Sequence, residues 1–170
     1  MTTECLLPTE RLLVRGFTLD DLDAFHTYRN DVDVARWQGW NVPYSYAEAT
    51  ALVTEMATAD LFRRGAWTQL AVEHLERSGL IGDIGVRMEA NEPTAELGVT
   101  FSTAAQGVGY ATEALEVVIT HLFGSLDLAR VIAVAHIEHE RVHRLFDRVG
   151  LGAVARDGEE IVFSRRNPAA

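Results

Sequence analysis

The chain has 170 residues, of which 48% are hydrophobic and 24% are charged, and its formal net charge at pH 7 is −10. This composition fits one globular domain with a buried core. It includes no apolar run long enough to cross a membrane, and its negative charge excludes a general DNA- or RNA-binding protein, which needs a basic face. All 15 basic residues are arginine, which excludes sites that need a lysine, such as a Walker-type phosphate site or a Schiff base.

The N-terminal segment lacks the basic-then-apolar pattern of a signal peptide, from which we expect a cytoplasmic protein. We expect a single domain over residues 1–170, with loose tails at 1–8 and 166–170. The single cysteine, Cys5, excludes an internal disulfide and a cysteine-based zinc cluster. No set of His, Asp and Glu residues has the spacing of metal ligands, so we expect no metal site.

The first part of the chain predicts one strand followed by three helices. The strand covers residues 11–17, and the helices cover 19–29, 31–37 and 45–60. Ser45 and Glu48 match a capping box at the start of the third helix. An aromatic loop over residues 37–44 separates the second helix from the third.

The second part of the chain changes to the period of two that is typical of strands. The expected strands cover residues 67–74, 80–88, 96–101, 130–136, 153–155 and 161–163, and the expected helices cover 108–122 and 139–149. Residues 130–136 are almost continuously apolar, which predicts a strand buried on both faces. Gly150 suits a left-handed residue after the last helix. The order of elements predicts an α/β fold with a mixed sheet and helices on its faces.

A glycine-rich turn, QGVGYA at residues 106–111, lies between an expected strand and an expected helix. Two glycines let the backbone turn sharply and let a ligand approach the amides. Several N–H groups at a helix start then point outward together at the positive end of the helix dipole, and such a site holds a pyrophosphate without a lysine. The alternative is an ordinary helix start with a flexible turn. The pattern is not the dinucleotide-binding fingerprint, because it lacks the third glycine.

The same turn matches the Q/R-x-x-G-x-G/A signature of the GNAT superfamily of N-acetyltransferases. The resemblance extends from about Thr9 to Arg165, and ERVHRLFDRVGL resembles the late helix of many members. TERLLVRGFTLDDLDAFHTYRND resembles the branch that includes the Rim-type ribosomal-protein N-terminal acetyltransferases. The resemblance implies a mostly antiparallel sheet that splays apart between residues 96–101 and 130–136.

The resemblance further implies that the protein transfers the acetyl group of acetyl-CoA to a primary amine by direct attack. The acceptor would be a small molecule or a peptide N-terminus, and the protein a monomer or a homodimer. The pantetheine arm would lie beside one strand, the pyrophosphate on the glycine turn, and the nucleotide near the late helix. The cofactor-binding residues implied in this way are Val99, Thr100, Phe101, Gln106, Gly107, Val108, Gly109, Tyr110, Ala111, Thr112, His139 and Arg144.

The late helix departs from the family pattern at three positions. His139 stands where many members have an asparagine, Val142 where related members have a serine, and Phe146 where many others have a tyrosine. Valine and phenylalanine cannot donate a proton to the leaving thiolate. Water, His139 or His143 would then return the proton, or the chain is a CoA-binding sensor or partner module without catalysis.

A general base must take a proton from the ammonium form of the acceptor. The expected catalytic candidates are Glu96, at an acidic position common in the family, and His136, at the end of a buried strand; each also fits a purely structural role. His74 and Asp83 are weaker candidates.

The aromatic residues Trp37, Trp40 and Tyr44 cluster in the loop before the third helix. They suit the wall of an acceptor pocket, because aromatic rings hold a cation by its charge. They equally suit a hydrophobic clamp that ties the N-terminal helices to the sheet.

Overall fold

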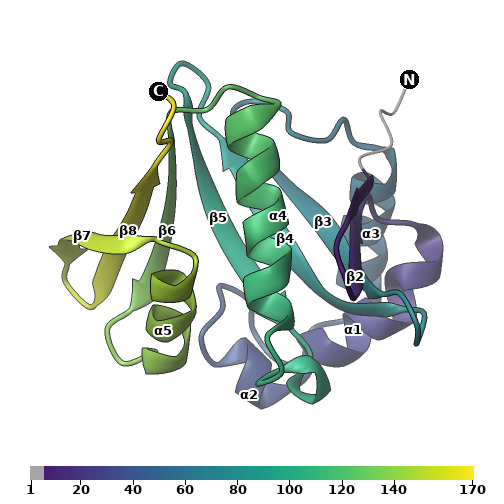
Figure 1. Ribbon diagram of the computed structural model, residues 1–170. Coiled ribbons are helices and arrows are strands. Elements are labelled where there is room, and N and C mark those ends of the chain that lie inside the picture. Colours follow the sequence, from purple (N-terminus) through teal and green to yellow (C-terminus); the bar gives the residue numbers. More distant parts are fainter. Residues whose placement is uncertain (1–5) are drawn as a thin grey trace.

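The computed structural model describes residues 6–170, and it contains one sheet of eight strands with helices on both faces (Figure 1). The strands are β1 (Leu6–Pro8), β2 (Leu12–Arg15), β3 (Trp67–His74), β4 (Leu80–Met88), β5 (Thr94–Phe101), β6 (Arg130–His136), β7 (Gly152–Asp157) and β8 (Glu160–Arg166). The helices are α1 (Leu22–Arg29), α2 (Val32–Ala35), α3 (Tyr46–Thr58), α4 (Tyr110–Gly124) and α5 (Glu140–Arg148), with 3-10 turns at η1 (Leu19–Asp21) and η2 (Thr103–Ala105).

The strands lie in the order β1-β2-β3-β4-β5-β6-β8-β7. Neighbouring strands in the described sheet are antiparallel except for the parallel pair β5 and β6. This arrangement confirms the expected mixed, mostly antiparallel α/β fold. No helix within residues 6–170 is both long enough and apolar enough to span a bilayer.

Two expectations about individual segments are wrong. Leu6–Pro8 and Arg166 were expected in loose tails. Leu6–Pro8 instead form β1 and pair with β2, and Arg166 ends β8 opposite Arg130 of β6. Three residues that include a proline carry no periodic pattern, so the sequence could not reveal this edge strand. Residues 130–136 were expected to be buried on both faces, but their burial alternates between full and partial along β6. Cys5 lies outside the described residues.

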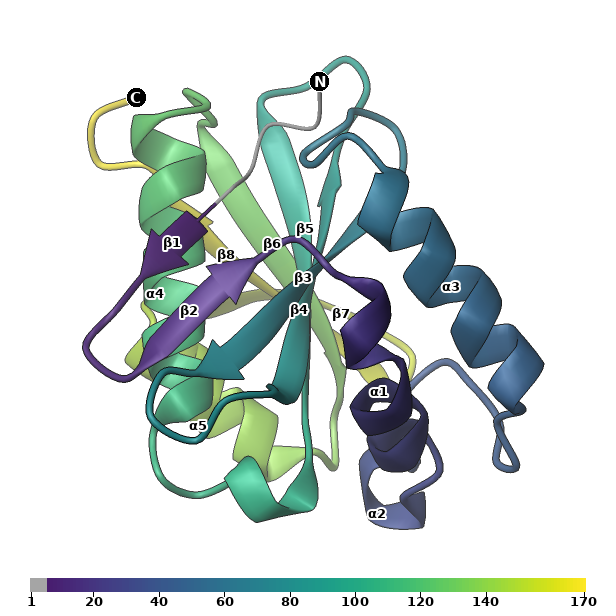
Figure 2. The ribbon, with the colours of Figure 1, turned by 90° about the vertical axis from the view of Figure 1, so that its right-hand side faces the viewer.

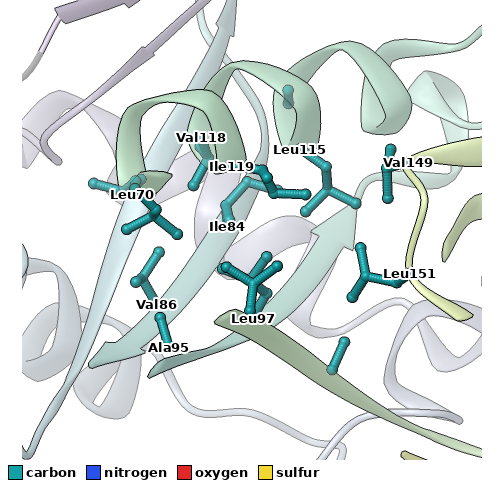
Figure 3. Close-up of a cluster of buried hydrophobic side chains, with 14 of the residues drawn as sticks. Leu70, Ile84, Val86, Ala95, Leu97, Leu115, Val118, Ile119, Val149 and Leu151 are labelled. Atoms are coloured by element: carbon teal, nitrogen blue, oxygen red, sulfur yellow. The ribbon is translucent and has the colours of Figure 1, made fainter. Parts of the chain in front are cut away.

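Helices cover both faces of the sheet, with α4 on one side and α3 on the other (Figure 2). The face toward α4 carries the larger core, in which Leu115 and Ile119 of α4 pack over Ile84 and Leu97 of the sheet (Figure 3). A second core lies under α1 and α3 and includes Phe25. The capping box predicted for α3 is confirmed, because the Ser45 and Glu48 side chains each accept a hydrogen bond from the other residue's amide.

The sheet opens between its two parallel strands (Figure 1). The pairing of β5 with β6 runs from Thr94 and Arg130 to Leu97 and Ala133, where it stops. Beyond this point, β5 stays paired with β4 and β6 stays paired with β8. The expected splay is therefore present, and it exposes the inner edges of both strands at one end of the sheet.

Candidate functional site

A cleft of about 530 Å³ lies at the open end of the splay. Its walls come from the end of β5, the glycine turn before α4, the helix α5 and the region of α2. All the residues expected to bind the cofactor line it except Val108, and the lining residues among them are Val99, Thr100, Phe101, Gln106, Gly107, Gly109, Tyr110, Ala111, Thr112, His139 and Arg144. The structure thus brings together side chains and amides that were selected from separate parts of the sequence.

The glycine turn presents its amides without a protein partner. Gly107 and Gly109 have φ angles of +80° and +87°, in the left-handed region that favours glycine, and Gly109 caps α4. Within residues 6–170, no group accepts a hydrogen bond from the N–H groups of Gly107 through Thr112. Because these N–H groups lie at the N-terminus of a 15-residue helix, they form a ready site for an anionic group.

Arg11, which was not among the candidate residues from the sequence, binds this turn through its guanidinium group. Its Nη1 donates to the Val108 carbonyl at 3.0 Å, and its Nη2 lies 2.7 Å from Glu113 Oε2. Its guanidinium also covers the Tyr110 ring, with Cζ 4.7 Å from the ring centroid. Val108, which does not line the cleft, therefore contributes a carbonyl that is turned away from the cleft.

Glu113 completes this anchor from the first turn of α4. Its carboxylate accepts hydrogen bonds from the Thr9 hydroxyl and from the backbone and side chain of Arg11. Partial burial acts to raise the pKa of Glu113, but the hydrogen bonds from Thr9 and Arg11 outweigh it and lower the pKa. The carboxylate therefore stays ionised, and the negative charge near the helix start favours α4.

Arginine side chains form the rim of the cleft on α5. Arg141, Arg144 and Arg148 all line it, and Arg144 Nη1 also lies 3.5 Å from Glu140 Oε2 one helical turn away. Guanidinium groups bind phosphate oxygens through several parallel N–H donors. The rim therefore adds positive charge beside the free amides of the glycine turn.

His139 lies where α5 begins, and its ring stacks on Trp37 with the centroids 4.7 Å apart and the planes 11° from parallel. Burial is the main cause that lowers the pKa of His139 to about 4, and the neighbouring Arg141 guanidinium acts in the same direction. The imidazole is therefore neutral near pH 7, and it keeps one N–H donor and one acceptor.

The other departures from the family pattern lie on the buried side of α5. Val142 lines the cleft, whereas Phe146 packs edge-on against Phe163 in the core. His143 Nε2 lies 2.9 Å from the His136 carbonyl, and His143 is not among the residues that line the cleft. Of the side chains considered as proton donors, His139 is therefore the one that lines the cleft.

The two main candidates for the general base have different surroundings. Glu96 lies where β5 and β6 are still paired and binds Arg87. It lines neither the cleft nor a second cavity that includes the end of β6. His136 lines the second cavity, and its Nδ1 accepts a hydrogen bond from the Glu138 amide at 3.2 Å. Its Nε2 lies 3.6 Å from Glu159 Oε2.

The weaker base candidates, His74 and Asp83, are both buried in structural networks. His74 Nδ1 accepts hydrogen bonds from two turn amides after β3. Asp83 accepts a hydrogen bond from the Tyr28 hydroxyl and lies 3.8 Å from the Arg29 guanidinium. Burial raises the pKa of Asp83, and Arg29 opposes this shift.

The structure separates the three aromatic residues expected in an acceptor pocket. Trp37 lines the cleft, but Trp40 and Tyr44 surround Arg29 of their own chain. The Arg29 Cζ atom lies 3.7 Å from the centroid of the Trp40 ring, and the Trp40 Nε1 donates to the Arg29 carbonyl at 2.9 Å. The cation held by these two rings is therefore an internal arginine.

A second cavity of about 430 Å³ lies beside the cleft. Its lining comes from the splayed half of β6 with His136 and from the segment 36–39. Gln38 Nε2 donates to the Val99 carbonyl at 3.2 Å, so this segment also contacts β5. Within residues 6–170 no three His, Cys, Asp or Glu residues lie together as metal ligands.

The family model described as "Acetyltransferase (GNAT) domain" matches residues 11–152 of this chain. The chain is similar to the "Uncharacterized N-acetyltransferase YoaA" of Bacillus subtilis (strain 168), with 29% identity over 147 residues that cover 85% of this chain and 81% of the relative.

Solved structures share the fold. A putative ribosomal-protein-serine acetyltransferase from Vibrio cholerae matches with a TM-score of 0.81 and 21% identity, over 98% of this chain and 99% of that chain. The spermidine N-acetyltransferase from Vibrio cholerae in complex with CoA and spermine matches with a TM-score of 0.76 and 18% identity, over 94% and 97% of the two chains.

Proposed function

The chain belongs to the acetyltransferase (GNAT) family and is an acetyl-CoA-dependent N-acetyltransferase, and on this basis we propose that it acetylates a primary amine by direct attack on the thioester. The observation that carries the proposal is the row of amide N–H groups from Gly107 to Thr112 that have no acceptor within residues 6–170. A pyrophosphate is the group that this arrangement suits best.

The residues around the cleft fit acetyl-CoA. The free amides at the start of α4 would hold the pyrophosphate, and Arg144 would meet the nucleotide phosphate. The inner edge of Val99, Thr100 and Phe101 faces the opening left by β6, so its backbone N–H groups are available to the carbonyls of the pantetheine arm. The carbonyls of Val99 and Phe101 already accept hydrogen bonds from the Gln38 and Gln106 side chains. Acetyl-CoA supplies the activated acetyl group as a thioester.

The backbone at Val99 is the proposed position of carbonyl polarisation. β5 leaves β6 after Leu97, so an amide near Val99 is no longer used by the sheet on that side. A fixed N–H donor there stabilises the negative charge that develops on the carbonyl oxygen during attack. Holding the amine close to the thioester supplies a further large part of the rate, because it replaces a bimolecular encounter.

The acceptor is proposed to be a small cationic amine or a protein N-terminus. The net charge of −10 favours a cationic acceptor. Two proteins of the same fold carry names that mention a ribosomal protein and spermidine, and the N-terminal segment resembles the Rim-type branch. These observations support an amine acceptor of either kind. Of the two base candidates, His136 lines the second cavity and Glu96 lines neither cavity, so His136 is the proposed base that removes the proton of the acceptor.

The alternative function is a CoA-binding sensor or partner module without catalysis. It is favoured by one observation: Val142 and Phe146 replace the side chains that return a proton to the thiolate in related proteins. In the catalytic interpretation, the neutral His139 or water carries out this step.

Two measurements on the purified protein test the proposal. Calorimetry with CoA measures binding at the cleft, and thiol release from acetyl-CoA with spermidine, ethanolamine and an alanine-initiated peptide measures transfer. Binding with amine-dependent thiol release supports the enzyme. Tight CoA binding without release on any amine supports the non-catalytic module, and the absence of CoA binding contradicts both.

A further inference from the structure

The cleft and the second cavity share one wall. Arg36, Trp37 and Gln38 line both of them, and the two cavities have no other lining residue in common. On the cleft side this wall faces Val99 and His139, and on the other side it faces His136. The wall therefore stands between the expected position of the thioester and a space with a candidate base.

The wall is attached to both arms of the splayed sheet. Gln38 Nε2 donates to the Val99 carbonyl on β5 at 3.2 Å. The Trp37 ring stacks on His139 at 4.7 Å and lies 5.6 Å from the His136 ring at the end of β6. These contacts bridge the gap that opens where β5 and β6 stop pairing.

A comparison with Trp40 shows that Trp37 does more than tie the loop to the sheet as part of a hydrophobic clamp. Both tryptophans are partly buried, but Trp40 packs on Arg29 and lines neither cavity, whereas Trp37 lines both of them. The loop from Trp37 to Tyr44 is thus anchored at one end by an internal cation and presents its other end to the cavities.

We propose that Trp37, held in place by Gln38, separates the donor cleft from the acceptor cavity and excludes water from the thioester. This inference rests on the proposed function. The amine then approaches from the His136 side past the edge of the indole, and Trp37 and Gln38 act as positioning residues. Loss of the indole joins the two cavities and opens a path for water to the donor cleft.

When the wall is lost, water can attack the thioester in place of the amine. In hydrolysis, the oxygen of water forms a bond to the acetyl carbon, the carbon–sulfur bond breaks, and one proton of water passes to the thiolate. The products are acetic acid and CoA. This reaction needs no amine, so it measures the wall without any knowledge of the acceptor.

The test uses the full chain with acetyl-CoA in a buffer free of amines. Trp37→Ala and Gln38→Ala remove the ring and its anchor, and Trp37→Phe keeps a ring in place. Tyr46→Ala is the matched control, because it removes an exposed aromatic side chain that lines neither cavity. Calorimetry with CoA is run on every variant beside the assay of thiol release.

The expected result is a rise of about tenfold in amine-independent thiol release for Trp37→Ala, smaller rises for Gln38→Ala and Trp37→Phe, and the wild-type rate for Tyr46→Ala. CoA affinity should stay within about threefold of wild type in all four, since the anchoring amides are elsewhere. Wild-type hydrolysis in both Trp37→Ala and Gln38→Ala, with CoA still bound, overturns the inference alone. Failure of the wild-type protein to bind CoA overturns the proposed function, and the inference with it.

Discussion

Arg11 Nε donates a 2.7 Å hydrogen bond to Glu113 Oε2, and this contact joins the residue before β2 to the first turn of α4. The same guanidinium binds the carbonyl of Val108 in the glycine turn. Because the carbonyl of Val108 is bound by Arg11, the orientation of the peptide groups in the turn is held by this contact. The anchor therefore determines the orientation of the proposed pyrophosphate site.

Arg11→Ala is expected to weaken CoA binding about tenfold and to lower the free energy of unfolding by about 1–3 kcal/mol, because several hydrogen bonds to charged groups are lost together. Calorimetry with CoA and urea denaturation measure the two effects. Arg63→Ala is the matched control, since Arg63 pairs with Glu55 on the exposed surface and should change stability by less than about 1 kcal/mol. An Arg11→Ala protein with wild-type CoA affinity would show that the turn keeps its orientation without the anchor.

Gly109→Asp is expected to abolish measurable CoA binding while the protein remains folded. Gly109 has a φ of +87°, and a Cβ there would lie 3.3 Å from Arg11 Nη2. The new carboxylate would lie beside Arg11 and compete with Val108 and Glu113 for its guanidinium, so it disturbs the anchor and adds negative charge to the turn that carries the proposed pyrophosphate site. The backbone strain costs about 1–3 kcal/mol. Calorimetry with CoA and circular dichroism check binding and fold.

A control substitution at a second glycine separates the effect of backbone strain from the effect of a negative charge in the glycine turn. Gly158, in the turn between β7 and β8, has a φ of +57° and open space around the position of a Cβ. Gly158→Asp introduces the same residue with similar strain, but outside the cleft. It should lose stability and keep wild-type CoA affinity, and equal losses of affinity in the two variants would argue against the assigned site.

His136→Asn is expected to lower kcat by about 100-fold at saturating acetyl-CoA, a loss typical of removing a general base. Asparagine keeps an oxygen near the place of Nδ1 as an acceptor for the Glu138 amide, so the strand end keeps its hydrogen bond. Glu96→Gln should stay within about threefold of wild type, because Glu96 is bound to Arg87 and lines neither cavity.

The pH–rate profile distinguishes the two residues. A base must be deprotonated to accept a proton, so the acidic limb of the profile belongs to the residue that fills this role. We expect His136→Asn to remove this limb and Glu96→Gln to keep it. The reverse pattern would assign the role to Glu96.

Features that depend on neighbouring residues in the chain could be predicted from the sequence. The capping box of Ser45 and Glu48 and the left-handed Gly150 are confirmed, because a few consecutive residues determine each of them. The glycine turn before α4 belongs to the same group. Its amides lack partners for a local reason: the first N–H groups of a helix have no acceptor within the helix.

Contacts between distant segments could not be predicted in this way. Arg11 and Glu113 are separated by 102 residues, and neither belongs to a motif that points to the other. The loop containing Trp40 and Tyr44 was expected either to face an acceptor or to tie the N-terminal helices to the sheet. No sequence pattern indicates that Arg29 of the preceding helix packs against these rings. The wall made by Trp37 and Gln38 likewise exists only because two arms of the sheet diverge beside it.

His139→Asn is expected to make the stability of the protein less sensitive to acid. Burial and nearby positive charge lower the pKa of His139 to about 4 in the folded protein, compared with about 6.5 for histidine in an unfolded chain. Between these two pH values the unfolded state binds a proton at this position and the folded state does not. The free energy of unfolding therefore loses nothing at this residue above about pH 6.5, and it decreases as the pH falls from 6.5 toward 4. Urea denaturation between pH 8 and pH 4.5 should therefore show a wild-type free energy of unfolding that falls more steeply below pH 6.5 than that of His139→Asn. Between pH 7 and 8 the two proteins should differ by a constant amount, which serves as the internal control. A constant difference down to pH 4.5 would mean that the ring stacked on Trp37 takes up its proton as readily in the folded protein as in the unfolded chain.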